Sequence, residues 1–271
     1  MMIVEVPEGG DSKSKAGEAT SEPEPELKNE APPPYMDPQE GTSTIQSSSR
    51  ALPDIKPSNF VCLSRQNDSI KGSWIIDPTM IIPSAFLPSL TDGETEETRG
   101  NISLMSRNGS IQAEIFVLPG TSNDDSRRLT NRKQTIIRSS SANGTITLKI
   151  HEVASRGSRL PLQIKAFSAN GSLNIYIPRS FQGPVSVSLR NGSLRYSESV
   201  RGLVTQFSEL NGAQRSFIGD FDANAIRDAG DWAGDAIWLE SRNGSIKVFF
   251  DDELDETPRQ KSSFLGKLFG F

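Results

Sequence analysis

An Asn-Gly pair between two stretches of alternating apolar residues recurs along this chain, and it constrains the fold more than any other feature. Written around the Asn, the unit is apolar-x-apolar-x-Ser-x-Asn-Gly-Ser/Thr-apolar-x-apolar-x-apolar. Near-complete copies, here called the full repeats, surround Asn108, Asn143, Asn170, Asn191 and Asn243. A degenerate copy surrounds Asn67, and Asn211 keeps only the Asn-Gly pair. Recurrence of one unit every few tens of residues is typical of repeat architectures.

The alternation on both sides of the Asn predicts two strands per unit. In the Asn170 unit, the apolar side of the pattern comprises Ile164, Ala166 and Ser168 before the turn and Leu173, Ile175 and Ile177 after it. A two-residue type I′ turn at Asn-Gly would place all six on one face. Both central residues of that turn need positive φ, which Asn and Gly tolerate well. The sequence therefore predicts an all-β fold with type I′ turns.

Two arrangements of these strands fit the sequence. Each unit can be one coil of a β-solenoid, with equivalent residues stacked between neighbouring coils. Alternatively, each unit can be an antiparallel hairpin, and the hairpins then form a sandwich or barrel. Near-identical turns favour stacking, whereas the uneven spacing of the Asn residues (41, 35, 27, 21, 20 and 32) favours hairpins. We predict the solenoid-like stack and keep the antiparallel β-sandwich of hairpins as the alternative.

The two ends of the chain differ in composition from the repeats. Residues 1–57 hold nine of the 17 Pro and eleven acidic residues against five basic ones, a net charge of −6. Such a segment buries too little apolar surface to offset its ordering entropy, so we expect a disordered N-terminal tail. The β-repeat domain is expected over 58–255. Residues 256–271 form a linker and a short apolar tail, which either caps the last repeat or docks on a partner or membrane.

Composition also argues against several classes of protein. The single cysteine, Cys62, excludes an internal disulfide framework and fits a reducing compartment. The first residues lack the apolar core of a secretory signal, and no apolar run approaches the ~20 residues of a membrane span. Balanced charge outside the tail gives little support for nucleic-acid binding. We expect a cytoplasmic or nuclear protein without a transmembrane segment.

The side chains that catalysis and metal binding require are scarce. Nucleophilic catalysis usually needs a histidine base, and the only histidine, His151, is expected on the surface at a strand end. An EF-hand-like spacing is shared by Asp220, Asp222, Asn224 and Asp231. Ala225 stands where that calcium loop needs glycine, which argues against a metal. We predict no enzyme, no catalytic residue, no cofactor and no metal; tryptophans Trp74, Trp232 and Trp238 are expected in the core or at its rim.

One short motif in the tail points to a partner. Pro32-Pro33-Pro34-Tyr35 matches the Pro-Pro-x-Tyr ligand of WW domains, with Pro32, Pro33 and Tyr35 as the contact residues. Prolines pre-form a polyproline II helix at low entropic cost, and the tyrosine fills an aromatic-lined groove. The sequence thus predicts a protein-interaction scaffold that recruits WW-domain proteins. The alternative is a structural or self-associating β module.

The repeats resemble the adhesin-like repeat domains of many bacterial proteins. The combination of the PPPY tail, the repeats and the segment RSFIGDFDA at 215–223 is more similar to a fungal family of unknown function, of the mushroom-forming kind. This resemblance covers about residues 55–255. It implies a β-repeat fold and brings no known activity, cofactor or catalytic residue.

Overall fold

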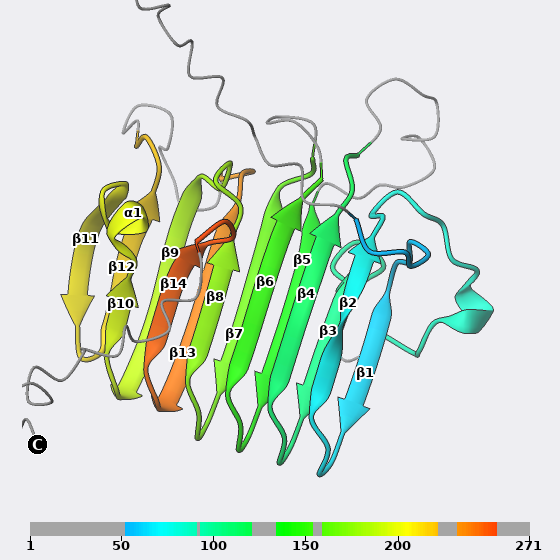
Figure 1. The fold of residues 1–271 in the computed structure, drawn as a ribbon, viewed down its shortest axis with the longest axis horizontal. Coiled ribbons are helices and arrows are strands. Elements are labelled where there is room, and N and C mark those ends of the chain that lie inside the picture. Colours follow the sequence, from blue (N-terminus) through cyan, green and yellow to red (C-terminus); the bar gives the residue numbers. More distant parts are fainter. Residues whose placement is uncertain (1–51, 91–92, 121–133, 154–158, 222–231, 254–271) are drawn as a thin grey trace, which may run out of the picture. The chain divides into compact units, whose positions relative to one another are not determined.

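The computed structural model describes residues 52–90, 93–120, 134–153, 159–221 and 232–253, and these residues form two β-sheets (Figure 1). The eight-stranded sheet has the order β1 (Val61–Arg65), β3 (Ile102–Ser106), β5 (Thr135–Ser141), β7 (Leu162–Ser168), β13 (Ala236–Asn243), β9 (Gly183–Asn191), β12 (Ala213–Ile218), β11 (Val204–Leu210). The six-stranded sheet has the order β10 (Leu194–Tyr196), β14 (Ile246–Phe250), β8 (Leu173–Ile177), β6 (Ile146–Glu152), β4 (Ile111–Val117), β2 (Ile70–Ile76). A one-turn helix, α1 (Glu198–Arg201), and a 3₁₀ turn, η1 (Ser84–Phe86), complete these elements.

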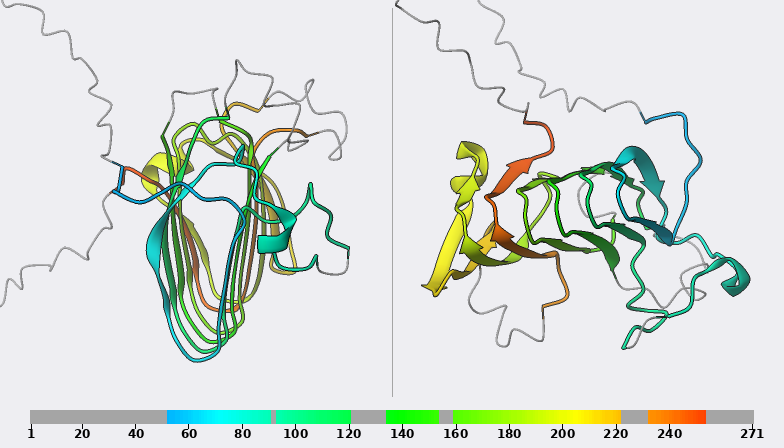
Figure 2. Two further views of the ribbon diagram at one scale, coloured as in Figure 1. Left: turned by 90° about the vertical axis from the view of Figure 1, so that its right-hand side faces the viewer. Right: turned by 90° about the horizontal axis from the view of Figure 1, so that it is seen from below.

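Each repeat is one coil of a solenoid-like stack. The strand before Asn-Gly lies in the eight-stranded sheet, the strand after it lies in the six-stranded sheet, and neighbouring coils pair in parallel. Seen along the stack, the coils superpose (Figure 2). The all-β, solenoid-like prediction is confirmed, and the sandwich of antiparallel hairpins is wrong. Antiparallel pairing is confined to β9, β12 and β11 among the described strands.

The uneven spacing of the repeats has two structural causes. Extra residues lie in the connections that return from the six-stranded to the eight-stranded sheet, opposite the Asn-Gly arcs (Figure 1). In addition, the coils do not stack in chain order. The last coil, β13 with β14, lies between the β7/β8 coil and the β9/β10 coil. A fixed coil circumference is therefore compatible with variable sequence spacing.

The prediction of type I′ turns is wrong for the repeats. Positive φ occurs at Asn211 (51°) and Gly212 (78°), which join β11 to β12 in an antiparallel hairpin. No Asn or Gly of the five full repeats has positive φ in the part of the chain that the structure describes. The Asn-Gly pairs of the repeats instead form arcs between two different sheets, so their residue choice needs another explanation.

Stacking of coils explains why the arc of each full repeat contains glycine. A Cβ built on Gly144 would lie 2.2 Å from the carbonyl oxygen of Gly109, and one built on Gly171 would lie 2.3 Å from that of Gly144. Gly244 and Gly192 continue the same column, at 2.3 and 2.1 Å. Only glycine allows neighbouring arcs to approach this closely.

The Asn and Ser of the motif bond from coil to coil. Side-chain amides form one ladder at 2.8–2.9 Å, in the order Asn67, Asn108, Asn143, Asn170, Asn243, Asn191. The inward-facing serine two residues before the Asn donates to an arc carbonyl of the preceding coil, as Ser168 Oγ does to Gly144 O at 3.2 Å. These bonds link the arcs of neighbouring coils; the asparagine amides are exposed, whereas the serines Ser106, Ser141, Ser168 and Ser241 are buried.

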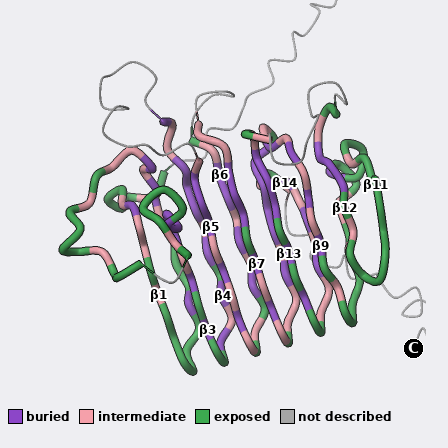
Figure 3. Tube along the Cα trace, turned by 180° about the vertical axis from the view of Figure 1, so that it is seen from behind, coloured by how far each residue is buried: buried purple, intermediate pink, exposed green. Residues whose placement is uncertain are grey.

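The core lies between the two sheets and consists of matching columns. The residue three places after each Asn lies beside its counterpart in the next coil, giving the column Ile70, Ile111, Ile146, Leu173, Ile246, Leu194. Buried and exposed residues alternate along the strands (Figure 3). Complete burial of one such Ile or Leu contributes about 1.5–3 kcal/mol. At the first coil the indole of Trp74 lies over Gly72 and packs on the end of this core.

A buried ion pair anchors the inserted coil. Asp235, directly before β13, accepts bidentate bonds from Arg159 at 2.6 and 2.7 Å. The same carboxylate accepts from the backbone N–H of Leu162 on β7 and of Gln182 before β9. Asp235 therefore bridges the two strands between which β13 inserts. Burial alone would lower the pKa of Arg159, but Asp235 and Glu152 outweigh it and the pKa is raised.

Candidate functional site

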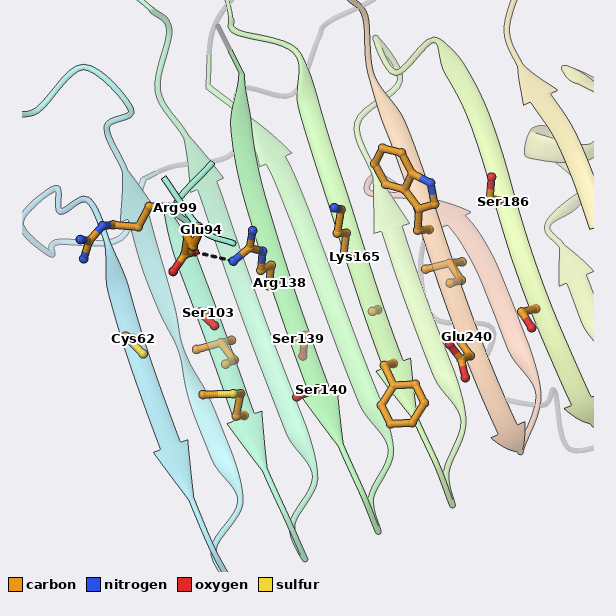
Figure 4. Close-up of a pocket in the computed structure, with 18 of the residues that line it drawn as sticks. Cys62, Glu94, Arg99, Ser103, Arg138, Ser139, Ser140, Lys165, Ser186 and Glu240 are labelled. Carbon is orange, nitrogen blue, oxygen red and sulfur yellow. Dashed lines mark hydrogen bonds and ion pairs between the residues drawn. The ribbon is translucent and has the colours of Figure 1, made fainter. Parts of the chain in front are cut away.

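The outer face of the eight-stranded sheet carries a groove of about 780 Å³ (Figure 4). Alternate residues of each strand point away from the core, and the parallel register aligns them in two rows across the sheet. The first row is Cys62, Ser103, Arg138, Lys165, Trp238, Ser186, Arg215. The second row is Met105, Ser140, Phe167, Glu240, Ser188, Ala213. Seven strands at the usual spacing make the first row roughly 29 Å long.

The segment between β2 and β3 forms one wall of this groove. Arg138 on β5 reaches it through two contacts, with Glu94 Oε1 at 2.6 Å and with the carbonyl of Thr98 at 2.8 Å. Within the wall, Arg99 donates to the carbonyl of Pro88 at 2.7 Å. Figure 4 shows the Arg138–Glu94 pair at the mouth of the groove. These bonds hold the wall against the sheet and neutralise part of the positive charge of the first row.

Apolar and aromatic side chains are exposed in the middle of the groove. Trp238 is 40% and Met105 41% exposed, so both present apolar surface to a ligand in the groove. The ammonium of Lys165 lies 5.0 Å from the centre of the Trp238 ring, within cation–π range. The guanidinium of Arg242 lies 5.4 Å from the Phe167 ring centre. These contacts fix the rings in place, so the groove presents preformed aromatic surfaces.

The chemistry of the groove suits binding. Serine hydroxyls, three aromatic rings and charges of both signs give hydrogen bonds, apolar contact and ionic complementarity on one surface. The thiol of Cys62, the only cysteine in the chain, is exposed at one end of the first row. No histidine lines the groove.

The only histidine lies on the other sheet, and its expected surface position is wrong. His151 is 4% exposed, because Phe116, Glu114 and Asp251 enclose its ring. Its Nδ1 lies 2.9 Å from Asp251 and its Nε2 lies 3.3 Å from Glu114. Asp251 directly follows β14, so this contact ties the end of the inserted coil to β6 and β4.

The other candidate residues of the sequence fall in several places. Pro32, Pro33 and Tyr35 lie outside the described residues, as does the apolar tail at 256–271. Of the EF-hand-like set, Asp220 is described and the other three are not; the described residues contain no cluster able to hold a metal. Trp232 packs edge-on against Phe217, as expected for a rim residue. Trp238 instead lies on the outer face.

Sequence reasoning missed the groove. Its residues occupy the outward positions of the alternation, where any polar residue is acceptable on a solvated strand. One signal was available: Trp238 stands at an outward position, five residues before Asn243, where the other full repeats carry Ser, Arg or Lys. A tryptophan there has no core to enter and indicates a contact surface.

A comparison with protein-family models identifies the domain. Residues 59–253 match the model described as a domain of unknown function, DUF7330. The chain belongs to this family. The matched range spans every strand of the DUF7330 domain, from β1 to β14, and includes both rows of the groove.

Other comparisons are distant. None of the curated proteins matches the chain. Among solved structures, a candidate cell adhesion protein from Clostridium sporogenes ATCC 15579, determined at 1.95 Å resolution, is similar with 9% identity and a TM-score of 0.32. That match covers 71% of this chain and 93% of the bacterial one. A likeness this weak says nothing about the activity of the DUF7330 domain. The fungal origin expected from the sequence stays a prediction. Among the described residues, no helix has the length and apolar character of a membrane span.

Proposed function

We propose that this chain is a non-catalytic protein-interaction scaffold. The observation that carries the proposal is the preformed groove on the eight-stranded sheet, with Trp238 and Met105 exposed along its floor. Such exposed aromatic and sulfur-containing side chains are enriched at protein interfaces and supply most of their binding energy. In this view the solenoid holds the partner and the acidic tail recruits a second protein.

The groove suits a partner that presents an apolar side chain beside a carboxylate. Trp238 offers the apolar contact, Lys165 lies beside it in the same row, and Arg215 follows on the other side beyond Ser186. Arg138 is already neutralised by Glu94, so the remaining cations select for negative charge on the partner. The parallel sheet beneath is rigid, which keeps the entropic cost of binding low.

Capture with the full chain tests the groove. A photo-crosslinker on Cys62, the only thiol, labels proteins that occupy this face. We expect a cross-linked partner that is lost with Trp238→Ala and kept with Phe207→Ala, a matched exposed aromatic on β11. Equal capture by both variants would show that the groove is not the contact surface.

The tail motif is tested separately with isolated WW domains. Calorimetric titration of the full chain should show binding that Tyr35→Ala abolishes, since the tyrosine fills the aromatic groove of a WW domain. Pro25→Ala, a tail proline outside the motif, is the control and should leave binding unchanged. Absence of binding to every WW domain tried would contradict the proposed recruitment of WW-domain proteins by the tail.

A self-associating module is the second candidate. Its support is the outer edge of β1, where no further strand pairs among the described residues. Free edges are templates for pairing with another chain. Sedimentation equilibrium of the full chain decides this point: concentration-dependent dimers that Ser64→Pro abolishes favour self-association, and a monomer at all concentrations excludes it.

A further inference from the structure

The two sheets end unequally at the β9/β10 end of the stack. The eight-stranded sheet continues past β9 with β12 and β11, whereas the six-stranded sheet stops at β10. The inner face of β11 consequently lacks an opposing strand in the part of the chain that the structure describes, and most of its residues are exposed. Helix α1 covers only part of this end, through the buried Val200.

A cavity of about 660 Å³ occupies the position of the missing strand. This end cavity is lined by residues of β9, β10, the hairpin and α1, among them Leu189, Leu194, Val204, Gln206 and Gln214. The hydroxyls of Tyr196 and Ser216 lie 3.0 Å apart and tie β10 to β12. The cavity is therefore bounded by the edge of one sheet and the inner face of the other.

The free edge of β10 retains backbone groups for pairing. Ser193 O accepts from Ile246 N, and Ser197 N donates to Val248 O, so these residues direct their backbone to β14. Because alternate residues of a strand face opposite neighbours, Leu194 and Tyr196 direct theirs to the cavity side. An extended peptide placed there would extend the six-stranded sheet by one strand, as in β-strand addition.

The charge of the end cavity selects the peptide. Arg190, Arg195 and Arg201, from β9, β10 and α1, all line it, against the single acidic residue Glu209. None of the three arginines has an ion-pair partner among the described residues, while Glu209 accepts from Gln206 at 3.1 Å. One charge on an edge strand merely discourages pairing. Three arginines from three elements around one hollow instead favour an acidic ligand.

We propose that the end cavity binds an acidic, extended segment of a partner protein, which adds a strand to the edge of β10. Its side chains alternate, with apolar residues toward Leu189, Leu194 and Val204 and carboxylates toward Arg195 and Arg201. This site is separate from the groove and does not depend on the function proposed for it.

Fluorescence anisotropy with the full chain tests the proposal. The probe is a labelled peptide of alternating Glu and Val; we expect saturable binding that weakens with salt and is absent for the Lys/Val version. A Glu/Val peptide with a central proline should also fail, because proline removes the backbone donor that pairing needs. Arg195→Glu and Arg201→Glu should each raise the Kd roughly tenfold or more.

Matched variants separate this site from the rest of the molecule. Arg65→Glu, an exposed arginine on β1 at the other end of the stack, should leave the Kd unchanged. Trp238→Ala should also leave it unchanged, so failure of the groove and failure of the end cavity are distinguishable. Equal binding of the proline peptide would mean unspecific attraction of polyanions and would overturn strand addition. Absence of Glu/Val binding, or equal loss with Arg65→Glu, would overturn the site itself.

Discussion

Replacing Asn143 by Asp separates the two possible reasons for asparagine in the repeats. Asn143 Nδ2 donates to Asn108 Oδ1 at 2.8 Å, and its Oδ1 accepts from Asn170 Nδ2 at 2.8 Å. Asp has the same shape and keeps the acceptor, but it places an oxygen where the donor was. Two oxygens then face each other in the ladder. Because both side chains are exposed, water can solvate these oxygens, and the net loss of the hydrogen bond costs about 0.5–1.5 kcal/mol.

The matched variant is Asn211→Asp in the β11–β12 hairpin. There the asparagine has positive φ, and Asp-Gly suits a type I′ turn nearly as well as Asn-Gly. We expect a loss of less than about 0.5 kcal/mol, typical of a tolerated surface change. Urea unfolding followed by circular dichroism gives both values from the midpoints.

The pH gives a second readout on the Asn143→Asp variant. A neutral carboxyl carries an O–H that can donate to Asn108, so the folded state favours the protonated form. The loss of stability caused by Asn143→Asp is therefore present at pH values above the pKa of the introduced carboxyl group. It shrinks as the pH falls below that pKa. If Asn143→Asp is tolerated as well as Asn211→Asp, asparagine serves the turn and the ladder adds no stability.

Three further predictions concern stability. Gly144→Ala should lower the free energy of unfolding by about 1–3 kcal/mol through overpacking against Gly109. The control is Gly202→Ala, because a Cβ there would lie 3.7 Å from its nearest neighbour. Urea unfolding should show this variant to be as stable as the original chain or more stable. Asp235→Asn should cost about 1–3 kcal/mol, because it removes the bidentate carboxylate and leaves Glu152 as the remaining counter-charge of the buried Arg159. The exposed Glu240→Gln should change the urea midpoint little. Burial raises the pKa of Tyr196 above its usual 10.0. The phenol therefore ionises first in the unfolded state, and the free energy of unfolding falls as the pH rises above about 10. Tyr196→Phe should reduce this fall, measured as urea midpoints over a series of pH values.

Much of the fold was predictable because the apolar residues alternate on both sides of the Asn-Gly pair in each repeat. The alternation around each Asn predicted the strands, and Ile164, Leu173 and Ile175 were predicted to face the core, where they are completely buried. The type I′ prediction failed because the preference of Asn-Gly for positive φ competes with another use of the same residues. A column of close backbone contacts also demands glycine, and an amide ladder also demands asparagine.

The sequence by itself determined the strands and their inward faces, because both follow from a period of two repeated around the same short motif. The near-identical turns favoured parallel stacking but left antiparallel hairpins open, and the structure decided between them. Only the tertiary structure decided the order of the coils. The slot between β7 and β9 is filled by β13 because the carboxylate of Asp235 bonds to both flanking strands, a contact between residues distant along the chain. The groove and the end cavity also depend on that order: Trp238 lies beside Lys165 and Ser186 only because β13 is inserted there.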